Sequence, residues 1–142
     1  MADQDLIKVA RGVVEAFNRS DWEACTAALT PDSVYDEVGT SRRLQGPPQI
    51  IQALQGWKGA MPDVKGTVTN ALGTGNTVVL EVTWHGTNTG PLPRPSGTLP
   101  ATGIQQTTRS GWVLNFDRDR IKESRHCFDM LSFLQQLGIM SS

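Results

Sequence analysis

The first third of the chain carries apolar side chains at helical spacing. Apolar residues three or four apart between Leu6 and Phe17 predict an amphipathic first helix. Ser20 and Glu23 then form a capping-box pattern, which predicts a second helix that ends before Thr30-Pro31-Asp32. The chain therefore opens with two helices in sequence.

The next segment mixes strand, loop and helix signals. Residues 34–38 predict a short strand, and residues 39–46 predict a polar loop. Pro47-Pro48 stands in the first turn of a third helix, where proline is tolerated, and Pro62 ends that helix. The predicted buried face of this helix consists of Ile50, Leu54, Trp57 and Met61.

Beyond residue 63 the pattern changes to strands and ends in a helix. Gly73-Thr74-Gly75-Asn76 is typical of a hairpin connection, and residues 88–103 form a long loop of the kind that often covers a binding site. The predicted strands span residues 64–72, 77–87, 104–117 and 120–128, and the last helix spans residues 130–138. Helices grouped on one side of a mostly antiparallel sheet predict an α+β fold.

Composition narrows the class of protein. The chain has 142 residues, 38% of them hydrophobic and 19% charged, which suits one domain over residues 1–142 with one core. The formal net charge is −1 and no basic stripe is visible, so we expect no nucleic-acid partner. The polar start Met1-Ala2-Asp3-Gln4-Asp5 is unlike a secretory signal, and no apolar run could span a membrane. These absences favour a cytoplasmic protein with no membrane partner.

Cysteine and histidine are too few for a metal or disulfide framework. Cys25 and Cys127 are expected to be reduced, buried thiols, although one bridge between them stays open. Together with His85 and His126 they lack the spacing of a zinc site, so no metal is expected.

Several segments, in their order along the chain, resemble one known family. The resemblance covers nearly the whole chain and is carried by Phe17 to Trp22, Leu29 to Asp32, Gly46 to Asp63, Gly86-Thr87-Asn88-Thr89-Gly90, Pro100 to Gly103, and the ending from His126 to Gly138. These segments resemble the SnoaL-like polyketide cyclases (ester cyclases) of the nuclear-transport-factor-2-like superfamily. The resemblance implies N-terminal helices packed in a strongly curved sheet that forms a cone-shaped cavity. It also implies a homodimer, a small hydrophobic or polyketide-like ligand and no cofactor.

The resemblance also implies a chemistry centred on Asp129. In this family the aspartate at the start of the last helix acts as the general acid/base of an intramolecular aldol ring closure. Asp129 stands equally well at the N-cap position of that helix, where aspartate is favoured for structural reasons. The same fold also supports hydratases, dehydratases, isomerases and epoxide hydrolases, and a non-catalytic binding module stays open. The sequence departs from the family in having Asn88 in place of a histidine and Arg125 in place of a tryptophan, and in lacking a histidine in Tyr35-Asp36-Glu37-Val38.

Successive side chains of a strand point to opposite faces of the sheet, and this alternation predicts which residues near Asp129 share its face. Arg125 shares parity with Asp129, so the concave face that holds one should hold the other. Arg125 would then clamp an anion or carbonyl group, or else it pairs with Glu123. His126 has the opposite parity and is predicted to face solvent or a dimer partner, as is His85, unless a β-bulge reverses the parity.

Four further residues are candidates for substrate binding. Trp57, Trp84 and Tyr35 could stack on a flat substrate, although aromatic residues at periodic positions also belong to ordinary cores. Gln106, or its neighbour Gln105, could point inward and donate a hydrogen bond to a substrate carbonyl.

Overall fold

The structure, a computed structural model, describes residues 3–94 and 97–140. It is a mixed α+β fold, as the sequence pattern predicts. The helices are α1 (Asp3–Asn18), α2 (Trp22–Ala27), α3 (Pro47–Ala60) and α4 (Met130–Gln136), with a 3₁₀ turn η1 (Val38–Thr40). The strands are β1 (Leu29–Glu37), β2 (Arg42–Gln45), β3 (Lys65–Thr74), β4 (Thr77–Thr87), β5 (Gln105–Asp117) and β6 (Arg120–Phe128).

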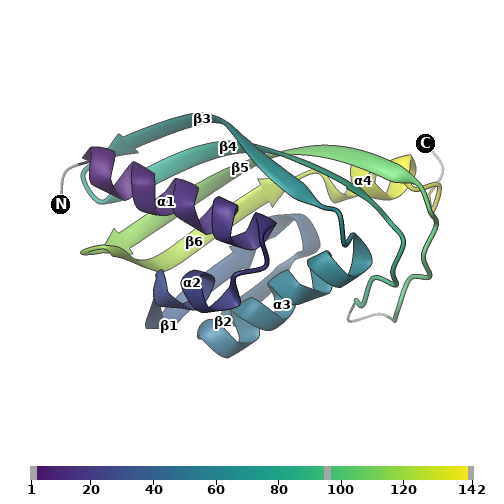
Figure 1. Cartoon of the computed structure of the whole chain (residues 1–142), viewed down its shortest axis with the longest axis horizontal. Coiled ribbons are helices and arrows are strands. Elements are labelled where there is room, and N and C mark those ends of the chain that lie inside the picture. Colours follow the sequence, from purple (N-terminus) through teal and green to yellow (C-terminus); the bar gives the residue numbers. More distant parts are fainter. Residues whose placement is uncertain (1–2, 95–96, 141–142) are drawn as a thin grey trace.

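The six strands form one open, curved sheet in the order β2-β1-β6-β5-β4-β3 (Figure 1). All neighbouring strands are antiparallel except β1 and β6, which run parallel. The parallel pair is possible because the chain passes through α3 and four strands before β6 returns beside β1. This places the N-terminal strand next to the strand that precedes the last helix.

Helices α1, α2 and α3 lie on one side of the sheet, and α4 lies at the end of the sheet near β5 (Figure 1). Helix α1 packs on β3 and β4, and α3 packs on β1 and β2. Helix α1 presents Leu6, Ala10 and Val14 to the core, each at most 2% exposed. The side chains that complete this core come from the concave face of the sheet, including Val78, Leu80, Leu114, Phe116 and Ile121.

The structure differs from the sequence prediction mainly around β1 and β2. Helix α2 begins after Asp21, whose carboxylate accepts a hydrogen bond from the Ala24 N–H, so Asp21 and not Ser20 is the N-cap. Strand β1 begins at Leu29, earlier than predicted, because it pairs with β6. Strand β2 lies in the segment predicted as a polar loop, since a polar edge strand carries little apolar alternation.

The long loop after β4 is anchored by one buried amide. Asn88 is 1% exposed, and its Nδ2 donates hydrogen bonds to the carbonyl oxygens of Ala60 and Gly90. Its Oδ1 accepts from both the backbone N–H and the hydroxyl of Thr102. Asn88 therefore ties the loop to the end of α3 by using all of its hydrogen-bonding capacity.

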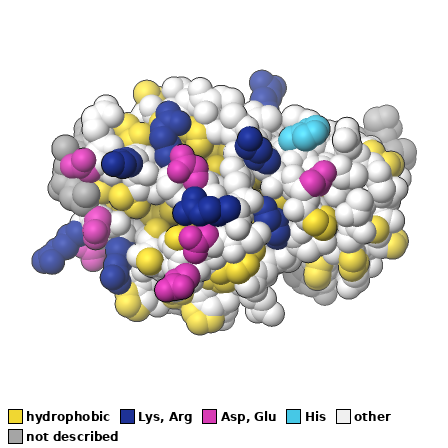
Figure 2. All heavy atoms as spheres, in the orientation of Figure 1, with side chains coloured by type: hydrophobic (Ala, Val, Ile, Leu, Met, Phe, Trp, Pro, Cys, Tyr) yellow, Lys and Arg dark blue, Asp and Glu magenta, His cyan; other side chains and the backbone are white. Residues whose placement is uncertain are grey.

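The surface is of mixed character. On the face shown in Figure 2, basic and acidic side chains are interspersed over the helices. Within the described part of the chain, none of the helices is both long enough and apolar enough to cross a bilayer.

The two cysteines differ in their surroundings. Cys25 is buried, and burial raises the pKa of its thiol to about 11, with the nearby Asp21 charge acting in the same direction. Cys127 is exposed, contrary to the expectation of two buried thiols, because it lies on the outer face of β6. Both are free thiols.

Candidate functional site

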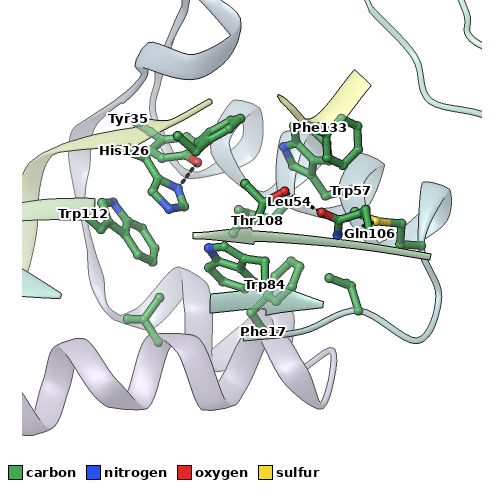
Figure 3. A pocket seen from close by; sticks show the side chains of 14 residues that line it. Phe17, Tyr35, Leu54, Trp57, Trp84, Gln106, Thr108, Trp112, His126 and Phe133 are labelled. Carbon is green, nitrogen blue, oxygen red and sulfur yellow. Dashed lines mark hydrogen bonds between the residues drawn. The ribbon is translucent and has the colours of Figure 1, made fainter. Parts of the chain in front are cut away.

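The concave face of the sheet and the helices enclose an apolar cavity of about 70 Å³. Figure 3 shows side chains from the helices and the sheet pointing into a common space. The cavity is lined by Val13, Phe17, Tyr35, Leu54, Trp57, Met61, Val64, Trp84, Gln106, Thr108, Trp112, His126, Phe128 and Phe133. Four tryptophan or tyrosine rings and one histidine in a mainly apolar lining make this the candidate ligand site.

His126 is the only ionisable group besides Tyr35 in this lining, and it is 6% exposed. Its Nδ1 lies 2.9 Å from the Tyr35 hydroxyl, and its Nε2 lies 2.9 Å from the Ser110 hydroxyl. The imidazole stacks on the Trp112 ring at 4.6 Å between centroids, with 15° between the planes. Both ring nitrogens and one ring face are thus held in place.

The hydrogen bonds around Ser110 assign the histidine tautomer. The Ser110 hydroxyl donates to the Val82 carbonyl oxygen and accepts from Trp84 Nε1 at 2.9 Å. With its proton used in this way, Ser110 can only accept from His126 Nε2. His126 Nδ1 then carries the free lone pair, which accepts the Tyr35 O–H.

Burial sets the charge states of this pair. Burial lowers the pKa of His126 to about 4, although the nearby Glu37 carboxylate acts in the opposite direction, so the imidazole is neutral at pH 7. Burial, and then the charge of Glu37, raises the pKa of the Tyr35 hydroxyl well above its ordinary value. A neutral imidazole and a protonated phenol are a potential base and a potential hydrogen-bond donor at the same place.

Glu37 is a buried carboxylate beside this pair, with its side chain fully covered. Burial alone raises its pKa, but hydrogen bonds from Arg42 Nε (2.7 Å), Thr40 Oγ1 (2.5 Å) and Trp57 Nε1 (3.0 Å) and the Arg42 charge lower it overall. Glu37 therefore stays ionised and places a fixed negative charge near His126.

A second polar group lies at the other end of the cavity in Figure 3. Gln106 is 2% exposed; its Oε1 accepts from Thr108 Oγ1 at 2.5 Å, and its Nε2 lies 3.2 Å from the Met61 sulfur. An amide nitrogen has two N–H groups and sulfur is a weak acceptor, so Nε2 has donor capacity left for a ligand oxygen. Trp112 Nε1 is a further buried donor with no partner among the described residues.

The sequence-predicted catalytic residues lie elsewhere. Asp129 is exposed and outside the cavity lining, and its carboxylate accepts the Ser132 N–H at 3.0 Å as the N-cap of α4. Arg125 is half-buried, and its Nη1 donates to the side chains of Glu123 and Asn115. The pair with Glu123 is the structural alternative to a substrate clamp that the sequence left open. The structure does not bring Asp129 and Arg125 together in the cavity.

A β-bulge explains why the predicted faces were wrong. Asn115 on β5 pairs with Glu123, but the next residue, Phe116, pairs with Ile121, which leaves Lys122 without a partner. This extra residue reverses the parity of β6, so that Ile121, Ser124 and His126 all point inward. A signal was present in the sequence, because the apolar residues Ile121 and Phe128 have opposite parity and only a bulge allows both to face the core.

The four residues proposed for substrate binding do line the cavity. Tyr35, Trp57, Trp84 and Gln106 all contribute to it, while His85 is exposed on the outer face. Trp84 can lie over β3 because Gly66 is there: a Cβ at this glycine would come within 2.6 Å of the indole ring. Among the described residues, no group of three or more His, Cys, Asp and Glu side chains comes together as metal ligands would.

Comparison with known proteins identifies the family. The model of the SnoaL-like polyketide cyclases matches residues 7–137. The chain belongs to this family. A search of the curated proteins found no significant match.

Solved structures share the fold of this SnoaL-like chain. One is a proposed SnoaL-like polyketide cyclase from Jannaschia sp. CCS1, with 14% identity and a TM-score of 0.86, which covers 97% of this chain and 94% of the other. Another is IdmH, a proposed polyketide cyclase from Streptomyces antibioticus, with 24% identity and a TM-score of 0.77, which covers 92% of this chain and 96% of the other. A third is an LEH-like epoxide hydrolase from M. tuberculosis, with 20% identity and a TM-score of 0.73, which covers 95% of this chain and 90% of the other. At these identities the similarity concerns the fold.

Proposed function

We propose that this protein is a cofactor-independent cyclase that closes a ring in an apolar polycarbonyl substrate by an aldol reaction, with His126 as the acid/base group. The observation that carries the proposal is the buried, neutral imidazole of His126 in an otherwise apolar cavity, 2.9 Å from the Tyr35 hydroxyl. A hydrogen on carbon between two carbonyl groups is acidic enough to be removed by a side-chain base, and such chemistry benefits from a dry site.

The first step forms an enolate. A substrate carbonyl oxygen replaces His126 Nδ1 as the acceptor of the Tyr35 O–H, which leaves the Nδ1 lone pair free. Nδ1 then takes the proton from the adjacent carbon, and the C–H electron pair moves onto the carbonyl oxygen. The Tyr35 O–H stabilises the enolate oxygen in the manner of an oxyanion hole.

The second step forms the ring and returns the proton. The enolate carbon attacks a second carbonyl carbon of the same substrate, and the Gln106 Nε2–H donates to the alkoxide oxygen that develops there. The imidazolium passes its proton to this alkoxide, which restores neutral His126. Stacking on Trp112 and the charge of Glu37 stabilise the imidazolium while it exists.

Asp129 takes no part in this scheme. Its carboxylate is bound to the first turn of α4 and is exposed, whereas the base of an aldol closure has to reach the carbon inside the cavity. The role that the family resemblance implies for Asp129 thus passes to His126.

The proposal is tested with a synthetic aryl 1,3,7-triketone, in which the carbon between the first two carbonyl groups attacks the third. Ring closure and loss of water give a cyclohexenone, which is followed by ultraviolet absorbance. We expect the wild-type protein to accelerate closure and His126→Gln to lose about 100-fold or more, in line with the usual contribution of general acid–base catalysis. Circular dichroism and retained binding of the triketone control for folding. Binding without turnover by the wild-type protein would instead indicate a non-catalytic binding module.

We also propose a homodimer formed through the outer face of the sheet, as family likeness suggests. Leu72 pairs with Val79 and Val79 pairs with Val113, which makes an apolar row on that face. Leu72 is 61% exposed, so this row has surface left to bury against a second copy.

A further inference from the structure

A second hollow of about 310 Å³ lies beside the apolar cavity and differs from it in charge. We call it the arginine groove. It is lined by Gly39, Thr40, Ser41, Arg42, Trp57, Leu92, Pro93, Arg94 and Met130. Two guanidinium groups and no carboxylate belong to this lining.

Arg42 is held with part of its donor capacity unused. Its Nε donates to the Glu37 carboxylate at 2.7 Å, and its side chain is 27% exposed. The Nη1 and Nη2 groups make no hydrogen bond to the described residues. Because Glu37 fixes the guanidinium plane, these N–H groups are presented to the groove with little freedom to lose on binding.

Arg94 supplies a positive charge without a matching acid. Its Nε is buried and has no hydrogen-bond partner, and no ion pair within the described part of the chain engages its guanidinium. Its backbone is fixed by paired hydrogen bonds with Gly97 and follows Leu92, which is buried in the core. The charge of Arg42 is balanced by Glu37, so Arg94 leaves the groove with an excess of one positive charge.

The groove and the cavity share an aromatic wall. Trp57 lines both, and its ring packs edge-on against Phe128 and Phe133 in the cavity. Phe128 in turn lies against Gly39 of the groove, where an added Cβ would come within 2.5 Å of the phenyl ring. The cavity and the groove are therefore neighbours at the Trp57 ring, and a ligand that occupies both has to pass this ring.

We propose that the substrate carries a carboxylate, which Arg94 and Arg42 bind in the arginine groove while the apolar body occupies the cavity. A guanidinium matches a carboxylate with two parallel N–H···O bonds, and such charge-assisted pairs are the stronger class of hydrogen bond. This inference rests on the proposed function and names its substrate class: an apolar polycarbonyl acid, as opposed to a neutral ester.

The test uses 4-(2-naphthyl)butanoate and its methyl ester, with binding to the full chain followed by tryptophan fluorescence. We expect the acid to bind about tenfold tighter than the ester, and Arg94→Gln to bring the two affinities to within about twofold of each other. Arg109→Gln, which removes an exposed arginine on β5, is the matched control and should keep the preference. Arg42 is unsuitable for this test because its loss would leave Glu37 buried and unpaired.

Further arms separate failure of this inference from failure of the proposed function. Leu54→Phe narrows the cavity and should weaken both probes, with circular dichroism as the folding control. Suppose that Leu54→Phe weakens both probes. If acid and ester then bind the wild-type protein equally, or if Arg94→Gln keeps the preference for the acid, the proposed carboxylate site is wrong, whereas ligand binding in the cavity is supported. If the corresponding naphthyl phosphate binds tighter than the acid, the groove is a phosphate site and the carboxylate proposal is overturned. If Leu54→Phe affects neither probe, the proposed use of the cavity fails.

Discussion

At the scale of single residues, the proposed function depends on how the protein holds His126. The imidazole is neutral because it is buried, and it is oriented because Tyr35, Ser110 and Trp112 contact three sides of it. A histidine that is buried and fully hydrogen-bonded can also be purely structural. The cavity beside it, with the Tyr35 hydroxyl in contact with the imidazole, is what favours a chemical role.

The lowered pKa of His126 predicts acid sensitivity. The unfolded chain protonates this histidine near pH 6.5 and the folded chain only near pH 4, so its contribution is present above pH 6.5 and is lost as the pH falls to 4. The loss is about 3 kcal/mol in the free energy of unfolding. Urea unfolding of the wild-type protein and His126→Gln at pH 7 and 4.5 measures it. Equal pH dependence of the two proteins would show that His126 has an ordinary pKa.

The capping role of Asp129 makes a separate prediction. Asp129→Ala should lower the free energy of unfolding by about 1 kcal/mol, because the Ser132 N–H loses its acceptor, and Asp129→Asn should keep most of the stability. Thermal or urea unfolding at pH 7 compares the two variants. An unchanged stability of Asp129→Ala would contradict the cap.

At the scale of elements, the long loop after β4 depends on Asn88. Asn88→Ala removes four side-chain hydrogen bonds, and the Gly90 carbonyl oxygen and the Thr102 hydroxyl lose their Asn88 partner. The Ala60 carbonyl oxygen and the Thr102 N–H keep one backbone partner each. We expect a loss of about 3 kcal/mol in the free energy of unfolding. Asn70→Ala, at an exposed position of β3, is the control and should change it by less than about 0.5 kcal/mol. A similar, small effect of both substitutions would mean that the loop is held by other contacts.

The elements themselves were largely predictable, whereas the faces of β6 were not. Strands β4 and β6 have the predicted bounds, because their apolar alternation is regular and turn residues flank them. Which side chains of β6 point inward depends on one unpaired residue, Lys122. This bulge arises from the pairing of β6 with β5, a tertiary contact that the local sequence pattern does not show. Strand parity alone therefore assigns His126 to the outer face, whereas Tyr35, Trp57, Trp84 and Gln106, the candidates for substrate binding, do line the cavity.

At the scale of the whole molecule, the open sheet leaves its outer face available for assembly. If the apolar row of Leu72, Val79 and Val113 forms the dimer interface, Val79→Lys should shift the protein to a monomer in light scattering coupled to size exclusion. Thr69→Lys, at an exposed position on the same strand as Leu72, adds the same charge outside the row and serves as the control. A wild-type monomer, or a dimer unaffected by Val79→Lys, would contradict this assembly.

The whole fold brings distant segments together at the proposed proton-transfer site. Tyr35 from β1 and His126 from β6 are 91 positions apart, and the parallel pairing of their strands makes their contact possible. The sequence resemblance assigns the chemistry to Asp129, one residue before α4, and the structure offers a different group inside the cavity. These alternatives make opposite predictions for one pair of variants.

The most direct measurement is the rate of ring closure of the aryl 1,3,7-triketone by His126→Gln and Asp129→Asn, side by side with the wild-type protein. We predict a loss of about 100-fold or more for His126→Gln and less than about threefold for Asp129→Asn, because Asn keeps the helix cap. A large loss in Asp129→Asn with full activity in His126→Gln would contradict our assignment and return the acid/base role to Asp129.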